Sequence, residues 1–250
     1  MTVEQQEMLP LFLARMGKTI IRPGGMTMTN ELLEQCHLNE QTTILEVACN
    51  IGTTAIHLAK KYGSKVVAVD LNPQIVAMAQ DNIGKHGASN LVSVQQGDAL
   101  SLPFEDSRFD VLINEAMLTA FAPEMRTQAL AEFSRVLKPG GVLVTHDLLH
   151  IEPQSTLTDN EIPAEQLDEK RWRSYYEASP FEIMEMKTGD LRLFSFIGIL
   201  QDEGITGLIR ILQNIEDNEE DQQRFIDVVQ NFDDRRKIVG SIAFISKNQK

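Results

Sequence analysis

The sequence has 250 residues, of which 42% are hydrophobic and 24% charged, so it can bury a sizeable core. Its formal net charge of −13 argues against a nucleic-acid partner, because affinity for phosphate backbones comes mainly from Lys and Arg. No apolar run approaches the ~20 residues that span a membrane, and the first residues are acidic where a signal peptide is basic. We expect a cytoplasmic protein without a nucleic-acid or membrane partner; a homodimer is possible.

The two cysteines, Cys36 and Cys49, are too few and too far apart for a disulfide framework or a metal-binding cluster. We expect each to be a small core residue in a reducing compartment, and we predict no metal site.

The first 40 residues read as an N-terminal helical cap. Apolar spacing predicts helices over residues 9–16 and 30–36. Between them lies IRPGGMT, residues 21–27, whose Pro-Gly-Gly turn cannot continue a helix.

From Thr43 onward strands and helices alternate. The continuous apolar runs predict strands over 42–47, 64–70, 91–98, 109–115 and 142–147. Helices are predicted over 53–63, with Gly63 as C-cap, over 71–87, with Asn72 as N-cap and Pro73 at the first helical position, and over 123–141, ended by Pro139-Gly140-Gly141. Strands that are apolar throughout indicate a parallel sheet covered on both faces, a doubly wound α/β core over residues 41–150.

After Asp147 the rhythm changes. We expect a helix within 164–178, a strand over 181–189, two helices over 196–236 and a final strand over 237–247 that returns to the sheet. The result is a mainly parallel, seven-stranded Rossmann-like sheet. Residues 151–250 would then complete the core and carry a helical lid, about 188–236, over the edge of the sheet where ligands bind.

The turn after the first strand, ILEVACNIG, carries the chemistry. It lacks the G-x-G-x-x-G of dinucleotide-binding enzymes. Instead Glu46 precedes three alternating small residues, Ala48, Asn50 and Gly52. That arrangement resembles motif I of the class I S-adenosylmethionine-dependent methyltransferases, where the small residues are usually glycines. The resemblance continues through VVAVDLNP, GDALSLPFEDSRFD, FDVLINEAM and RVLKPGGVLVTHD, and covers roughly residues 40–147.

The resemblance implies S-adenosylmethionine as cofactor. Asp70 would accept hydrogen bonds from the ribose hydroxyls, and its distance from Glu46 is near the offset of about 20 residues expected for such an acid. Asp98 would bond the adenine amino group, and Glu46 would order the loop or receive the methionine ammonium through water. The implied cofactor-binding residues are Glu46, Ala48, Cys49, Asn50, Gly52, Asp70, Leu71, Asp98, Ala99, Asn114 and Glu115.

The two departures from glycine lead to backbone predictions. Asn tolerates positive φ better than most residues, so Asn50 can occupy a left-handed turn. Alanine is strained at positive φ, so we expect Ala48 at negative φ.

Each residue also has a simpler interpretation. Asp98 could be an ordinary turn residue, and Asn114 with Glu115 a polar exit from a strand. Glu115 and His146 are weak catalytic candidates; a lone His is more often structural, although His146-Asp147 at the end of the fifth strand would face the same cleft. Trp172, Tyr175 and Tyr176 suit core or lid packing. Arg22 could reach the cofactor carboxylate.

The predicted function is in-line methyl transfer from S-adenosylmethionine to a small molecule, which needs alignment more than a dedicated base. The acidic lid hints at a neutral or cationic substrate. The alternatives are a regulatory protein that binds S-adenosylmethionine without catalysis, and a nicotinamide-dependent oxidoreductase.

Overall fold

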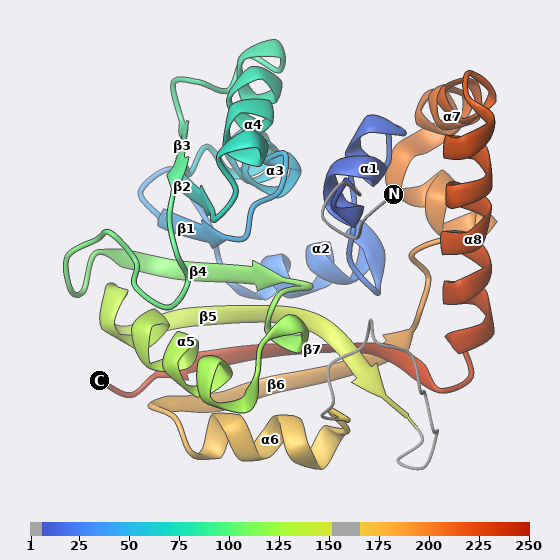
Figure 1. Cartoon of the computed structure of the whole chain (residues 1–250). Coiled ribbons are helices and arrows are strands. Elements are labelled where there is room, and N and C mark those ends of the chain that lie inside the picture. The colour runs from blue at the N-terminus through green and yellow to red at the C-terminus, as the bar shows by residue number, and fades with distance from the viewer. Residues whose placement is uncertain (1–6, 152–165) are drawn as a thin grey trace.

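A computed structural model describes residues 7–151 and 166–250. Its centre is one seven-stranded sheet in the order β3-β2-β1-β4-β5-β7-β6, in which β7 is antiparallel to both neighbours and the other pairs are parallel (Figure 1). The strands are β1 Thr43–Val47, β2 Lys65–Asp70, β3 Val92–Gln96, β4 Phe109–Glu115, β5 Leu137–His150, β6 Phe181–Asp190 and β7 Val239–Asn248. The predicted α/β fold and the return of the last strand to the sheet are confirmed.

Helices cover both faces of the sheet. On one face α2 Gly25–Gln35, α3 Thr53–Tyr62 and α4 Pro73–Lys85 share a buried core with β1, β2 and β4. On the other face α5 Pro123–Val136 and α6 Glu169–Glu177 pack against the same sheet. The aromatic residues of α6, Trp172, Tyr175 and Tyr176, are buried in that core, as expected.

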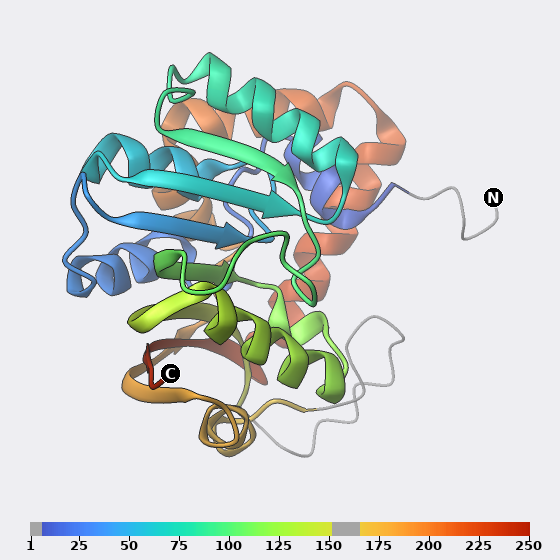
Figure 2. The ribbon, with the colours of Figure 1, turned by 90° about the vertical axis from the view of Figure 1, so that its left-hand side faces the viewer.

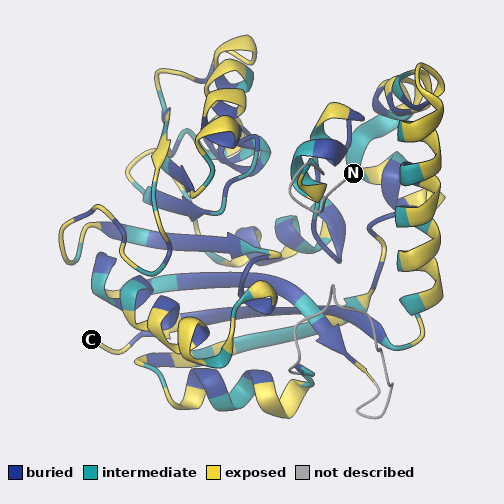
Figure 3. Ribbon diagram, in the orientation of Figure 1, coloured by how far each residue is buried: buried dark blue, intermediate teal, exposed yellow. Residues whose placement is uncertain are grey.

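A third core joins the N-terminal helix to two helices from late in the chain. It unites α1 Leu9–Arg15 with α7 Phe196–Glu216 and α8 Glu219–Arg235, the two helices inserted between β6 and β7. In Figure 1 these helices stand beyond the tips of the β4 and β1 arrows, and Figure 2, viewed from the left-hand side of Figure 1, shows them behind the sheet. The inner strands β1, β4, β5 and β7 are largely buried, while α4 and α8 present exposed outer faces (Figure 3). The division into cap, core and lid stays a prediction.

Local sequence signals explain most helix boundaries. The Asn72 side chain accepts a hydrogen bond from the backbone N–H of Gln74, and Pro73 begins α4, as predicted. Gly63 ends α3 with a φ of 69°, a conformation that favours glycine. No helix within residues 7–151 and 166–250 is long and apolar enough to cross a membrane.

Three boundaries differ from the prediction because distant contacts set them. Helix α2 begins at Gly25 rather than residue 30, since Asp202 of α7 accepts a hydrogen bond from the Met26 N–H at 2.8 Å and so caps the helix. Helix α5 ends at Val136, because Leu137 pairs with Phe109 in the sheet. Strand β5 runs on to His150, where it pairs with Val239 of β7.

Candidate active site

The loop after β1 makes its turn with three left-handed residues. The φ angles are 60° at Ala48, 48° at Asn50 and 73° at Gly52. The prediction for Asn50 is confirmed, and the prediction of negative φ for Ala48 is wrong. Fixed backbone bonds impose the conformation, because the Cys49 N–H donates to the Val69 carbonyl at 3.0 Å and the Gly52 N–H to the Cys49 carbonyl at 2.9 Å. The strain of about 1–2 kcal/mol expected for a left-handed alanine is thus offset by the surrounding structure.

Asp70, at the end of β2, holds this loop in place. It is 9% exposed, and its two carboxylate oxygens accept hydrogen bonds from the backbone N–H groups of Asn50, at 3.1 Å, and Asn72, at 3.0 Å. Burial raises the pKa of Asp70 above its usual value, and these bonds oppose that shift. Because a carboxylate has about four acceptor positions, two remain for a ligand hydroxyl pair. Leu71 beside it is exposed.

Asp98 follows β3 and takes part in an ordinary turn. Its side chain is exposed, and Oδ1 accepts a hydrogen bond from the Leu100 N–H at 2.9 Å. The neighbouring Ala99 is buried. The Gly97 N–H donates to the Asp70 carbonyl at 3.0 Å, so this turn is attached directly to the end of β2. The simpler interpretation of Asp98 is observed, and Oδ2 stays available to a ligand.

A buried charged cluster lies at the ends of β1, β4 and β5, on the face covered by α2 and α3. Glu115 forms an ion pair with Arg22 and accepts hydrogen bonds from Thr29 Oγ1, at 2.5 Å, and Thr54 Oγ1, at 3.1 Å. Burial alone would raise the pKa of Glu115; the Arg22 charge and the hydrogen bonds overcome it and lower the pKa to about 2. A carboxylate with so low a pKa is a weak base, so Glu115 is an electrostatic partner.

Glu46 lies on the same face, one strand away. Its side chain is buried, and Oε2 has no hydrogen-bond partner among the described residues. Burial, and then the negative charge of Glu115, raise the pKa of Glu46 to about 8. A buried carboxylate oxygen that lacks a partner is suited to a cationic ligand, because the ligand supplies the missing donor and charge.

His146 is a structural residue here. Its side chain is fully buried, and Nε2 accepts a hydrogen bond from the Gly24 N–H at 3.0 Å, so Nδ1 carries the proton toward Glu115 Oε1 at 3.5 Å. A Cβ on residue 24 would lie 2.9 Å from Nε2, which explains the glycine. The expectation that His146 and Asp147 share a cleft is wrong, because successive strand residues point to opposite faces.

Asn114 is likewise separated from Glu115. It lies on the α5 and α6 face, where Nδ2 donates to Thr145 Oγ1 at 2.9 Å, and Tyr176 donates to the same hydroxyl oxygen at 2.6 Å. Asn114 is fully buried and its Oδ1 has no partner in the described part of the chain. The side chains of Asn114 and Glu115 therefore point to opposite faces of the sheet.

The sequence analysis did not predict a buried ion-pair cluster, the Lys18 cluster, between the N-terminal segment and α7. Lys18 Nζ is fully buried and lies 3.2 Å from both Asp202 Oδ2 and Glu203 Oε1. Glu203 also accepts hydrogen bonds from the Thr19 and Ile20 N–H groups at 2.8 and 3.0 Å. The available signal was the acidic pair inside the apolar run IGILQDEGITGLIRIL, since buried acids need partners.

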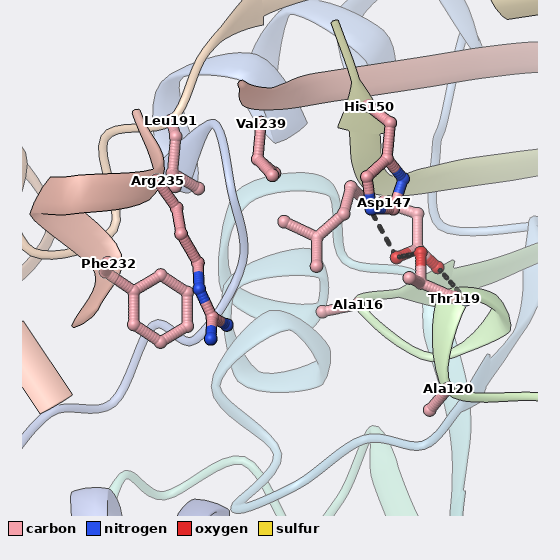
Figure 4. Close-up of a pocket in the computed structure, with 10 residues that line it drawn as sticks. Ala116, Thr119, Ala120, Asp147, His150, Leu191, Phe232, Arg235 and Val239 are labelled. Atoms are coloured by element: carbon pink, nitrogen blue, oxygen red, sulfur yellow. Dashed lines mark hydrogen bonds between the residues drawn. The ribbon is translucent and has the colours of Figure 1, made fainter. Parts of the chain in front are cut away.

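A cavity of about 190 Å³ opens beside the end of β4. The described residues that line it are Ala116, Thr119, Ala120, Asp147, Leu148, His150, Leu191, Phe232, Arg235 and Val239. Ala116, the residue after Glu115, has a φ of 52°, so the chain turns sharply there. Figure 4 shows Phe232 and Arg235 on one side of the cavity and Thr119, Asp147 and His150 on the other. Sequence patterns gave no sign that α8 would contribute to it.

The residues around the β1 loop suit the cofactor implied by motif I. Three buried polar atoms there lack a partner in the described structure: Arg22 Nε, Glu46 Oε2 and Asn50 Oδ1. The amino-acid end of S-adenosylmethionine carries both an ammonium donor and a carboxylate acceptor, so it can satisfy donors and acceptors together. No group of three or more His, Cys, Asp or Glu within residues 7–151 and 166–250 is placed to hold a metal ion.

Comparison with known proteins identifies the family. A family profile described as "Methyltransferase domain" matches residues 44–141, from β1 into β5. The chain belongs to the class I S-adenosylmethionine-dependent methyltransferases. Membership confirms the resemblance and the expected cofactor, and it decides against the nicotinamide-dependent alternative.

Relatives of this methyltransferase differ in how far they match. An uncharacterized protein of Haemophilus influenzae is 38% identical over 242 residues, which are 94% of this chain and 96% of that protein. Methyltransferase GfsG of Streptomyces halstedii is 32% identical over 127 residues, 50% of this chain and 45% of that protein. This chain thus spans about half the length of that named relative.

Solved structures agree on the fold. The MccD protein superimposes with a TM-score of 0.73 at 19% identity, covering 91% of this methyltransferase and 99% of that chain. A putative sarcosine dimethylglycine methyltransferase from Galdieria sulphuraria gives a TM-score of 0.69 at 15% identity over 89% and 84%.

Proposed function

We propose that this protein transfers the methyl group of S-adenosylmethionine to a small molecule held in the cavity beside Ala116. The observation that carries the proposal is the position of this cavity. It begins one residue after Glu115, at the same edge of the sheet as Glu46 and Asp70. Cofactor and acceptor sites at one edge allow the in-line approach that methyl transfer requires.

Three acids and one arginine would hold the cofactor. Asp70 would accept the ribose hydroxyls with its two remaining acceptor positions, and Glu46 would receive the ammonium group. Arg22, whose Nε lacks a partner, would bind the carboxylate. Asp98 Oδ2 would accept from the adenine amino group. Leu71 and Ala99 would flank the adenine, and the loop residues Ala48, Cys49, Asn50 and Gly52 would approach with their backbone.

The bound cofactor supplies an electrophilic methyl group on a sulfonium. The protein itself aligns the cofactor with the acceptor and removes water from around them. Glu115 keeps a negative charge at the end of β4, and Asp147 fixes the turn that forms the cavity wall by accepting hydrogen bonds from the Met117 and Thr119 N–H groups at 3.1 and 3.2 Å. We assign no general base, because Glu115 and His146 are both engaged in structural interactions.

Methyl-labelled S-adenosylmethionine tests the proposal. The protein is incubated with the small-molecule fraction of a cell extract, and label is followed into products by mass spectrometry. We expect a labelled metabolite with wild type and a strong loss with Asp70→Asn. Tight binding of S-adenosylhomocysteine without any labelled product would favour the regulatory alternative instead.

A further inference from the structure

The cavity beside Ala116 contains an acid that is not available to a ligand. Each carboxylate oxygen of Asp147 accepts two hydrogen bonds: Oδ1 from Thr119 Oγ1 and the Leu148 N–H, and Oδ2 from the Met117 and Thr119 N–H groups. Four donors fill the four acceptor positions of a carboxylate. The Thr119 hydroxyl hydrogen is used in the same network. Asp147 therefore shapes the wall and has no acceptor position left for a ligand's hydrogen bond.

His150 presents a donor on the same side of the cavity. Its Nδ1 accepts a hydrogen bond from the Leu167 N–H at 3.0 Å, which requires that nitrogen to be unprotonated. Burial lowers the pKa of His150, so the ring is neutral and its single proton is on Nε2. Because His150 lines the cavity, this N–H is the hydrogen-bonding group that the ring retains for a ligand.

The opposite wall carries a positive charge. Arg235, at the end of α8, stands across the cavity from His150 beside the ring of Phe232 (Figure 4). A guanidinium side chain is a cation, whatever its other contacts. Leu148, Leu191 and Val239 complete the apolar part of the described wall. The acidic first turn of α8, Glu219-Glu220-Asp221, is at the other end of the helix and does not line the cavity.

We propose that the methyl acceptor is a small, largely apolar carboxylate, bound with its charge toward Arg235 and an oxygen accepting the Nε2–H of His150. This substrate class rests on the proposed methyltransferase function. The cavity volume of about 190 Å³ favours a compact acceptor, so compounds with one substituted ring are the first probes. This class differs from the neutral or cationic substrate at which the acidic lid hinted.

Three ring compounds of equal size test the charge preference. With S-adenosylhomocysteine at saturation, calorimetry measures the binding of benzoate, benzyl alcohol and benzylamine to the full chain. We expect benzoate to bind at least ~10-fold more tightly than either other probe. Equal affinities, a preference for benzylamine, or no binding of any probe would overturn the substrate class.

Variants of adjacent arginines make the test specific. Arg235→Gln should reduce benzoate affinity at least ~10-fold while leaving the affinity for S-adenosylhomocysteine unchanged, and Arg235→Lys should restore much of the loss. Arg236→Gln is the matched control, because Arg236 pairs with Asp233 and does not line this cavity. Unchanged benzoate binding in Arg235→Gln would refute the inference. Failure of wild type to bind S-adenosylhomocysteine would instead refute the proposed function.

Discussion

Asp70 serves the loop and the proposed ligand with the same carboxylate. Each of its oxygens already accepts one backbone N–H, from Asn50 and from Asn72, so the acid is fixed in orientation before any ligand arrives. A preorganised acceptor pair loses little entropy on binding. Removing it would therefore cost the proposed ribose contacts and would also release the loop.

We expect Asp70→Ala to weaken S-adenosylmethionine binding at least ~10-fold, about 1.4 kcal/mol, in a calorimetric titration. The matched control is Asp81→Ala on the exposed side of α4, where the carboxylate pairs with Lys85. An Asp70→Ala protein with wild-type affinity would show that the ribose contact is elsewhere.

Glu46 should make stability depend on pH. Its folded-state pKa is about 8 rather than the usual 4.5, so between these values the folded protein holds a proton that the unfolded chain has released. Raising the pH through this range therefore lowers the free energy of unfolding. Glu115 does not contribute to the pH dependence in this range, because its pKa of about 2 lies below it. We expect the melting temperature of wild type to fall from pH 5 to 8 more steeply than that of Glu46→Gln; parallel curves would contradict the assignment.

Sequence alone was sufficient where one residue's own preference decides the structure. Asn50, Gly63 and Asn72 were correctly placed for that reason. It failed at Ala48, because two backbone hydrogen bonds of the loop, one of them to Val69 of β2, outweigh the preference of alanine.

At the scale of elements, the N-terminal segment and α7 behave as one unit. Asp202 caps α2 and pairs with Lys18, while Glu203 holds the backbone of Thr19 and Ile20. Immediately after this pair, α7 is broken at Gly204, where φ is 68°. These contacts join residues more than 170 positions apart, so no local pattern could have revealed that α2 begins at Gly25.

Lys18→Met should destabilise the fold by about 3–5 kcal/mol, because it leaves two buried carboxylates without their cation. Lys85→Met is the control: its ion pair with Asp81 is exposed, and its loss should change stability by no more than about 0.5 kcal/mol. Urea unfolding measures both. Equal effects of the two substitutions would mean that the Lys18 cluster contributes no more than a surface ion pair.

For the whole molecule, a ligand that binds only the folded state must raise its stability. At 100 times its Kd, S-adenosylhomocysteine should add about 2.7 kcal/mol, which corresponds to roughly 5–10 °C in melting temperature. NADH at the same concentration is the control and should give no shift. A shift with NADH alone would contradict the cofactor.

The global architecture was the most predictable feature, and the substrate site the least. Alternating apolar runs and Pro-Gly punctuation were enough to place the seven strands. The cavity combines residues from the segment after β4 with residues from β5, α8 and β7, whose proximity depends on how β7 returns to the sheet. Phe232 and Arg235 looked like ordinary residues of an acidic helix.

The position of β7 also has a consequence during biosynthesis. Although β7 lies between β5 and β6, the ribosome makes it after both, and at ~5–20 residues per second the interval after β5 is roughly 5–20 s. Throughout that time the edge of β5 that will pair with β7 lacks its native partner strand. Unpaired strand edges can pair with other chains. The nascent polypeptide should therefore depend on chaperones until its last strand emerges.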